Sequence, residues 1–266
     1  MKKWKFILIV TLLLVMSLFA FTQVSQSAGN DDLFTIVKTG TLADVKAALK
    51  NGADVNAMDK YGYTVLMWAA EYNTNPDVIE ALIDAGANVN VNAKNFSGRT
   101  ALDYAAAYNT NPDVTKALIA AGANVNARNG LGMTALLEAT RNRANPNLAD
   151  VIKALIDGGA DVNARDEVFG WTVLMNAACY ITNPNVIEDL IAAGANVNAR
   201  NGLGMTALMR AASWNTNPDV IKALIDGGAN VNARDSDGKR AIDHLESNEV
   251  IGKTDDSYWT IRDLLY

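Results

Sequence analysis

The stretch GANVNARNGLGMTAL runs from Gly122 to Leu136 and returns unchanged from Gly194 to Leu208. It begins with the pattern G-A-[DN]-V-N, whose glycine recurs at steps of 34 to 37 residues, at Gly52, Gly86, Gly122, Gly159, Gly194 and Gly228. It ends within T-[AV]-L-x-x-A-[AT], which starts at Thr64, Thr100, Thr134, Thr172 and Thr206. All five prolines lie in a third pattern, N-P-[DN], at Pro76, Pro112, Pro146, Pro184 and Pro218. A fixed period of this length is the signature of stacked structural repeats.

Each unit reads as a turn, a helix, a loop and a second helix. The turn at residues 59–62 precedes Thr64, a residue type that favours the N-cap of a helix. Asn75 and Pro76 suit the N-cap and the first position of the second helix, and Gly86 suits its C-terminal end. Apolar residues fall at helical spacing between these signals, and we expect burial of Leu66, Ala69, Ala70, Val78, Ile79, Leu82 and Ile83.

One such unit cannot bury its apolar face alone, so neighbouring units must stack. The patterns closely resemble the ankyrin repeat, because T-[AV]-L-x-x-A-A stands where that family has T-P-L-H-x-A-A. The motif I-[DA]-[AG]-G-A-[DN]-V-N-A likewise matches the end of the family's second helix and the loop after it. The resemblance extends from Asp32 to the C-terminus. It implies an all-α repeat solenoid, an ankyrin-type helix-loop-helix stack with short β-turn or hairpin connections.

The sequence departs from the family pattern in two ways. The family's proline after Thr is Ala or Val here, and its histidine is replaced at Met67, Asp103, Leu137, Met175 and Met209. We therefore expect the hydrogen bonds of that histidine to be absent and the turn to be looser, without a change of fold. The loop between the two helices carries N-T-N-P in place of the family's shorter turn.

The patterns also set the expected boundaries. Units at both ends lack parts of the motif and read as caps, and the last one predicts a closing amphipathic helix at residues 256–266. We expect that helix to cover the last repeat with Trp259, Ile261, Leu264 and Leu265. The predicted division is a signal peptide at 1–27, an N-terminal capping unit at 28–58, repeats at 59–93, 94–128, 129–165, 166–200 and 201–234, and a C-terminal capping unit at 235–266.

The N-terminal segment differs from the repeats. Three lysines, at positions 2, 3 and 5, precede an apolar run from Phe6 to Phe21, and Ser25 and Ser27 stand like the small residues before a signal-peptidase cut. The run is short for a membrane-spanning helix, which needs about 20 apolar residues. We expect cleavage after Ser27 and a periplasmic or extracellular protein, with a bacterial source. The alternative is an inner-membrane anchor formed by residues 6–21.

Composition argues against several classes of function. The formal charge of −6 gives no basic footprint for nucleic acid or an anionic membrane. His244 is the one histidine and Cys179 the one cysteine, so neither a histidine-rich nor a thiolate metal site is available. The two residues belong to units two repeats apart, too far for a nucleophile and its base. We expect no enzymatic activity, no cofactor and no bound metal.

The resemblance implies that partners bind the concave face, which turn tips and first helices form. The candidate residues at the tips are Tyr61, Tyr63, Phe96, Arg99, Leu131, Met133, Phe169, Trp171, Leu203 and Met205. On the first helices they are Trp68 and Tyr104, four residues after each Thr, and Tyr72, Tyr108, Tyr180 and Trp214, eight residues after it. Tyr, Trp, Met and Arg are enriched at interfaces. The eighth-position residues have a second interpretation, packing beneath the long loop.

The leading hypothesis is an exported monomer that binds an unidentified protein through this face. One alternative is a structural or assembly protein of the cell envelope, anchored by its N-terminal segment. Another is an inhibitor or effector of an unidentified enzyme. The sequence identifies no partner.

Overall fold

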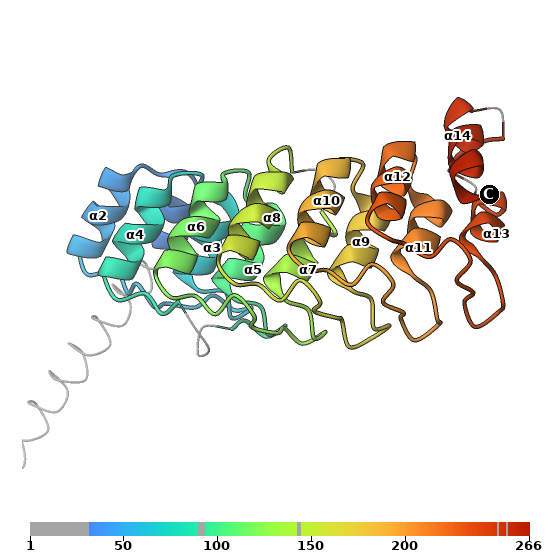
Figure 1. Ribbon diagram of the computed structural model, residues 1–266. Coiled ribbons are helices and arrows are strands. Elements are labelled where there is room, and N and C mark those ends of the chain that lie inside the picture. The colour runs from blue at the N-terminus through green and yellow to red at the C-terminus, as the bar shows by residue number, and fades with distance from the viewer. Residues whose placement is uncertain (1–31, 90–93, 143–144, 249, 254) are drawn as a thin grey trace, which may run out of the picture.

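The computed structural model describes residues 32–89, 94–142, 145–248, 250–253 and 255–266, so the predicted signal peptide lies outside the described residues. Helix pairs stack side by side in a single row (Figure 1). A helix at residues 32–39 and α2 (Leu42–Lys50) form the first pair. The pairs that follow are α3 (Val65–Tyr72) and α4 (Pro76–Asp84), α5 (Ala101–Tyr108) and α6 (Pro112–Ala120), α7 (Ala135–Ala139) and α8 (Leu148–Asp157), α9 (Val173–Tyr180) and α10 (Pro184–Ala192), α11 (Ala207–Trp214) and α12 (Pro218–Asp226), and α13 (Ala241–Glu246) and α14 (Asp256–Leu265).

This arrangement is the all-α repeat stack that the sequence predicts. The predicted helix signals act as expected: the Thr64 side chain accepts a hydrogen bond from the Met67 amide, and Asn75 does the same for Asp77. Pro76 occupies the first turn of α4, and Gly86 follows the helix with a φ of 95°, a conformation that glycine adopts without strain. None of the helices within the described residues is long and apolar enough to cross a bilayer.

The expected loss of hydrogen bonds at the histidine position is only partly correct. Asp103 accepts from both the amide (2.7 Å) and the hydroxyl (3.0 Å) of Thr100, which closes a capping box. The sulfur of Met67 lies 3.5 Å from the Thr64 amide and makes a weaker version of the same contact. Side chains other than histidine therefore hold the start of these first helices.

Buried asparagines of the long inter-helix loop tie most units to the one before. The Asn109 amide donates to the backbone carbonyls of Ala70 (2.8 Å) and Asn73 (2.9 Å) in the preceding unit. Asn215 makes the equivalent pair of bonds to Ala178 and Ile181. Because these carbonyls are buried away from water, each asparagine satisfies groups that would otherwise lack a partner. The N-T-N-P loop is thus a connection between units.

Backbone hydrogen bonds also join the turn tips of successive units. The Gly130 amide donates to the Ser97 carbonyl at 2.9 Å, and the Ser236 amide donates to the Leu203 carbonyl at 3.0 Å. Gly98 has a φ of 77°, and a Cβ there would lie 2.8 Å from the Gly130 nitrogen. Glycine is therefore required here for two reasons: the backbone has a positive φ, and the next tip lies too close for a Cβ. Among the described residues, β-pairing is confined to isolated bridges such as Met58 with Thr64.

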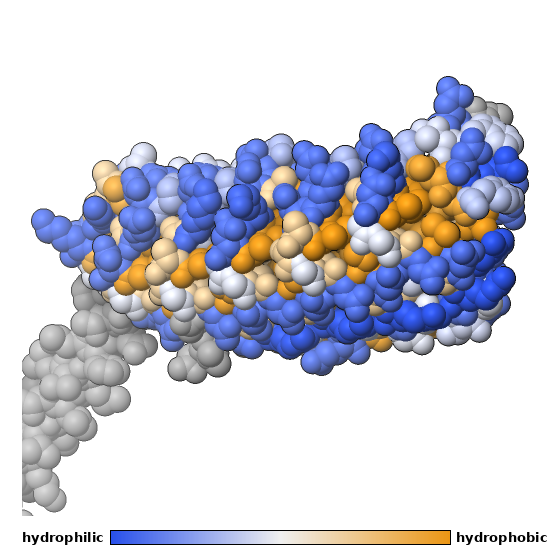
Figure 2. All heavy atoms as spheres, in the orientation of Figure 1, coloured by the Kyte–Doolittle hydropathy of each residue, from blue (hydrophilic) through white to orange (hydrophobic). Residues whose placement is uncertain are grey.

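The two helix rows differ in packing. Most neighbouring first helices (α3, α5, α7, α9, α11) pack more closely than neighbouring second helices (α4, α6, α8, α10, α12), because alanines line their contacts; α7 and α9 are the exception and contact each other little. We call the surface formed by the turn tips and the first helices the first-helix face. Figure 2 shows an apolar stripe across the second helices, where the isoleucines near each helix end are partly buried, namely Ile83, Ile119, Ile156, Ile191 and Ile225.

The closing helix is α14, and one predicted contact is wrong. Ile261 and Leu265 are buried as expected and Leu264 is partly buried, but Trp259 is 47% exposed. Tyr258 is buried in its place and meets Trp259 edge-on. The helix is rotated so that its inner side begins one residue earlier than the apolar pattern indicates.

Candidate protein-binding surface

Exposed apolar side chains stand at all five tips that were predicted to bind a partner. We call Tyr61, Phe96, Leu131, Phe169 and Leu203 the tip column; their exposed fractions run from 52% for Leu131 to 84% for Phe96. Phe96 stands one residue earlier in its turn than the others, and its ring lies against Gly62 of the preceding tip. Large apolar groups left in water at equal positions of successive units form a continuous feature of the surface.

A second column follows the ends of the first helices. Tyr72, Tyr108 and Trp214 are 51%, 46% and 50% exposed, and Tyr180 is half-buried. The central unit places Asn142 at this position. Tyr72, Tyr108 and Trp214 are therefore not covered by the inter-helix loop, whereas Tyr180 is partly covered. We call Tyr72, Tyr108, Tyr180 and Trp214 the helix-end column.

In the N-terminal half, stacked aromatic rings lead from the turn before α3 to the helix-end column. Tyr63 lies 5.0 Å from the ring of Trp68, and Trp68 lies 5.7 Å from Tyr72, with both pairs stacked. Tyr63 also reaches Tyr104 of the next unit at 5.0 Å. The ammonium of Lys38 lies 3.7 Å above the Trp68 ring. Stacked rings hold one another in place, so this part of the face is preorganised.

Two of the predicted residues do not reach the surface. Tyr104 and Met133 are each only 2% exposed, so they are unavailable for direct contact with a partner. Tyr104 is covered by Tyr63 and by Tyr108, whose ring lies 6.2 Å away. Met133 lies beneath Arg141, whose Nη1 is 3.3 Å from the sulfur. Tyr63, Trp68, Arg99, Trp171 and Met205 are half-buried and keep part of their surface exposed.

A recurring polar pair beneath the tips was not selected from the sequence. In several units, the residue five positions before the capping Thr forms a hydrogen bond with the residue four positions after that Thr. Asn95 donates to the Tyr104 hydroxyl (2.7 Å), and Asn129 donates to Glu138 (2.8 Å). At the last unit, Asp235 pairs with His244 at 2.7 Å. The sequence signal that could have predicted these pairs is a hydrogen-bond donor and an acceptor nine residues apart in each of these units.

Glu138 also receives a bond from the preceding unit. Arg99 Nη2 lies 2.6 Å from Glu138 Oε1, and Arg99 Nη1 lies 3.3 Å from the Tyr108 hydroxyl. Asp103 lies nearby, 2% exposed, and burial raises its pKa to about 6 although two bonds from Thr100 oppose the shift. The middle of the face thus combines one ion pair with a carboxyl group that titrates just below neutral pH.

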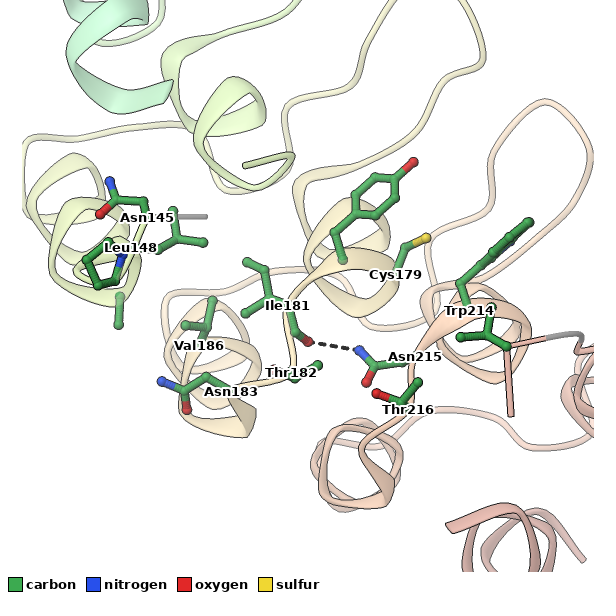
Figure 3. Close-up of a pocket in the computed structure, with 14 residues that line it drawn as sticks. Asn145, Leu148, Cys179, Ile181, Thr182, Asn183, Val186, Trp214, Asn215 and Thr216 are labelled. Carbon is green, nitrogen blue, oxygen red and sulfur yellow. Dashed lines mark hydrogen bonds between the residues drawn. The ribbon is translucent and has the colours of Figure 1, made fainter. Parts of the chain in front are cut away.

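A groove opens beside the helix-end column (Figure 3). Its volume is about 310 Å³, and Tyr180, Trp214 and Ile181 line part of it. Ile181 stands where other units carry the buried loop asparagine, so the groove lies at a break in that row of hydrogen bonds. The described residues contain no group of three His, Cys, Asp or Glu side chains close enough to hold a metal ion.

Comparison with known proteins places these features in a family. The family model for ankyrin repeats in three copies matches residues 33–129, 92–166 and 136–235. The human mitochondrial disaggregase is 40% identical over 68 residues, which are 25% of this chain and 10% of that protein. An ankyrin repeat protein of fowlpox virus (strain NVSL) is 48% identical over 44 residues, 16% of this chain and 9% of that one. The chain therefore spans about a tenth of these relatives.

Two solved structures are similar over most of the chain. The ankyrin repeat domain of Bcl-3, a member of the IkappaB protein family, has a TM-score of 0.66 and 25% identity, with 88% of this chain and 96% of that one covered. The ankyrin repeat domain of human ASB11 has a TM-score of 0.71 and 22% identity, with 88% and 95% covered. With the family model matching more than half of its residues, this chain belongs to the ankyrin repeat family.

Proposed function

We propose that this chain is an exported binding module that holds a partner protein against its first-helix face. Ankyrin repeats generally mediate protein–protein interaction. The observation that carries the proposal is the pair of parallel columns, in which five tip residues and three helix-end residues are between 46% and 84% exposed. Burial of such aromatic and aliphatic groups is the main source of binding free energy.

The spacing of the columns favours an extended occupant. Successive tips are joined by backbone hydrogen bonds, so their apolar side chains repeat along the stack in a fixed order. A partner that covers several units would bury several large side chains at once, and the rim of asparagines and charged residues would set its orientation. The second helices offer a weaker surface, because the isoleucines there are already partly buried against their neighbours.

A peptide-display experiment tests the face directly. The full chain would be used to select binders from a random peptide library, and the selected peptides would then be measured against a variant carrying F169S, L203S and W214S. These three residues are exposed, so we expect an unchanged helical circular dichroism spectrum and at least about a tenfold loss of affinity. The matched control is W259S with Y266S, which removes two exposed aromatic residues from α14.

The two variants separate the outcomes. Equal affinity of wild type and the triple variant for every selected peptide would place the binding surface elsewhere. An equal loss of peptide affinity in the control variant W259S/Y266S would also show that binding is not specific to the first-helix face. Export is tested separately by cell fractionation: a shortened soluble product supports it, whereas a full-length product in the membrane fraction supports the anchored envelope protein.

A further inference from the structure

One buried cation on the first-helix face has no carboxylate partner. Arg210 lies on α11 and is only 7% exposed. Its Nη2 donates to the sulfur of Cys179 at 3.1 Å, and its guanidinium lies 4.0 Å from the centre of the Trp171 ring. No Asp or Glu among the described residues forms an ion pair with it. A thiol and an aromatic ring are weaker partners for a buried guanidinium than an anion is.

Other polar atoms in the same two repeats lack partners as well. The Arg210 Nε, the indole Nε1 of Trp171 and the amide Nδ2 of Asn201 are buried donors without an acceptor. The Asn201 oxygen already accepts from the amides of Leu203 and Met205, which fixes the direction of its NH₂ group. Three donors therefore lack acceptors around α11, where the structure describes every residue.

The upstream repeat shows what is missing. At the equivalent positions Asn129 donates to Glu138, and Glu138 also receives Arg99 of the preceding unit. Asn201 stands where Asn129 stands, but Arg210 stands where Glu138 stands. A donor thus faces a donor, and the carboxylate that satisfies the upstream site is absent from the downstream one. A ligand that supplies a negatively charged oxygen would give the Arg210 guanidinium the anionic partner that Arg99 has in Glu138.

We propose that Arg210 is the docking point for an aspartate or glutamate side chain of the partner protein. This inference rests on the proposed function, because Arg210 lies among the exposed residues Phe169, Leu203 and Trp214 that the partner would cover. The partner's carboxylate would accept from the guanidinium beside the Trp171 ring. The contact with Arg210 would fix the partner's register. It would add little long-range attraction, because the chain as a whole has a formal charge of −6.

The carboxylate preference can be tested without the partner. The melting temperature of the full chain would be measured in sodium acetate and in sodium chloride at equal ionic strength, for wild type, R210M and R262Q. Acetate also stabilises proteins in general, and R210M reports that background. Arg262 is the matched control, because it too lies over a tryptophan, with 5.2 Å between its guanidinium and the Trp259 ring.

We expect acetate to raise the melting temperature of wild type and R262Q by about 2 °C more than that of R210M. R210K keeps the positive charge but not the planar guanidinium, so it should retain part of the acetate-induced rise in melting temperature. This variant distinguishes loss of the site from a folding defect in R210M. An increment of the same size in R210M and wild type would overturn the carboxylate site.

Peptides selected on the first-helix face test the source of the carboxylate. We expect them to be enriched in Asp and Glu, and R210M to weaken their binding at least about tenfold, with R262Q unaffected. Peptides that need Phe169 and Trp214 but show no acidic enrichment would overturn this inference and leave the proposed function standing. An acetate effect without any selected peptide would contradict the proposed function and leave Arg210 as a site for a small carboxylate only.

Discussion

The guanidinium of Arg99 lies 2.6 Å from the carboxylate of Glu138 and joins the tip of one repeat to the first helix of the next. The Glu138 side chain is 6% exposed and that of Arg99 24% exposed, so the pair is shielded from water on most sides. Asn129 donates to the same carboxylate oxygen at 2.8 Å. A partly buried ion pair with an additional hydrogen bond links three elements at the centre of the face.

Removal of this carboxylate should destabilise the stack. We expect E138A to lower the free energy of unfolding by about 3 kcal/mol, because it leaves the Arg99 Nη2 and the Asn129 amide without an acceptor and the guanidinium without its counter-charge. E138Q keeps the acceptor oxygen and should cost about 1 kcal/mol. Urea unfolding followed by circular dichroism measures both. K116A, which breaks an exposed ion pair with Asp113, should leave the midpoint unchanged; equal effects of E138A and K116A would refute the buried role of Glu138.

The stability of the chain should depend on pH through Asp103. Burial raises the pKa of this carboxyl group from 3.8 to about 6, so the folded state binds the proton more tightly than the unfolded chain does. The contribution is therefore most favourable below pH 4 and is lost as the pH rises through 6, at a cost of about 3 kcal/mol. D103N lacks this titration. The stability of wild type relative to D103N should fall between pH 4 and 7, and a constant difference would contradict the raised pKa.

Close contact between tips should make Gly98 intolerant of any side chain. Gly98 and Gly238 have nearly equal φ angles, 77° and 78°, but only at Gly98 would a Cβ meet a neighbouring backbone nitrogen, at 2.8 Å. G238A should cost about 1–2 kcal/mol of conformational strain. G98A should cost at least about 1 kcal/mol more, since the next tip must move. Chemical denaturation of the two variants gives the comparison, and equal losses would rule out tip-to-tip packing as the cause.

The loop asparagines should matter according to their burial. N109A removes the two bonds to the Ala70 and Asn73 carbonyls and should cost about 2–3 kcal/mol. N111A removes two exposed bonds, one donated to the Thr74 carbonyl and the N-cap bond accepted from the Asp113 amide, and should cost about 1 kcal/mol. Amide hydrogen exchange would show whether N109A loosens the contact between its two units. Similar stability losses in the two variants would show that burial does not decide the effect.

Much of the fold follows from local sequence signals. Thr64, Asn75, Pro76 and Gly86 act as the predicted caps and breaks, because capping depends on the residue and its immediate backbone. The buried position of Tyr258 was missed, because the rotation of a terminal helix is set by the unit on which it packs.

The candidate site was only partly predictable, because side chains that are distant along the chain, within one unit or in the next, cover one another. Tyr104 and Met133 are at the expected positions but are buried by residues from other tips and helices. Arg210 belongs to the same column as Trp68 and Tyr104, but its importance depends on the lack of an acceptor at Asn201, which a single repeat does not reveal. Exposure in a solenoid is a property of adjacent units together.

The most direct test of binding on the first-helix face is to locate the residues that a bound peptide contacts. A selected peptide carrying a benzophenone group would be photo-crosslinked to the full protein, and the modified residues would be located by mass spectrometry. We predict adducts on the tip and helix-end columns, at residues such as Phe169, Leu203 and Trp214. Adducts confined to the second helices α4, α6, α8, α10 and α12 would contradict binding on the first-helix face.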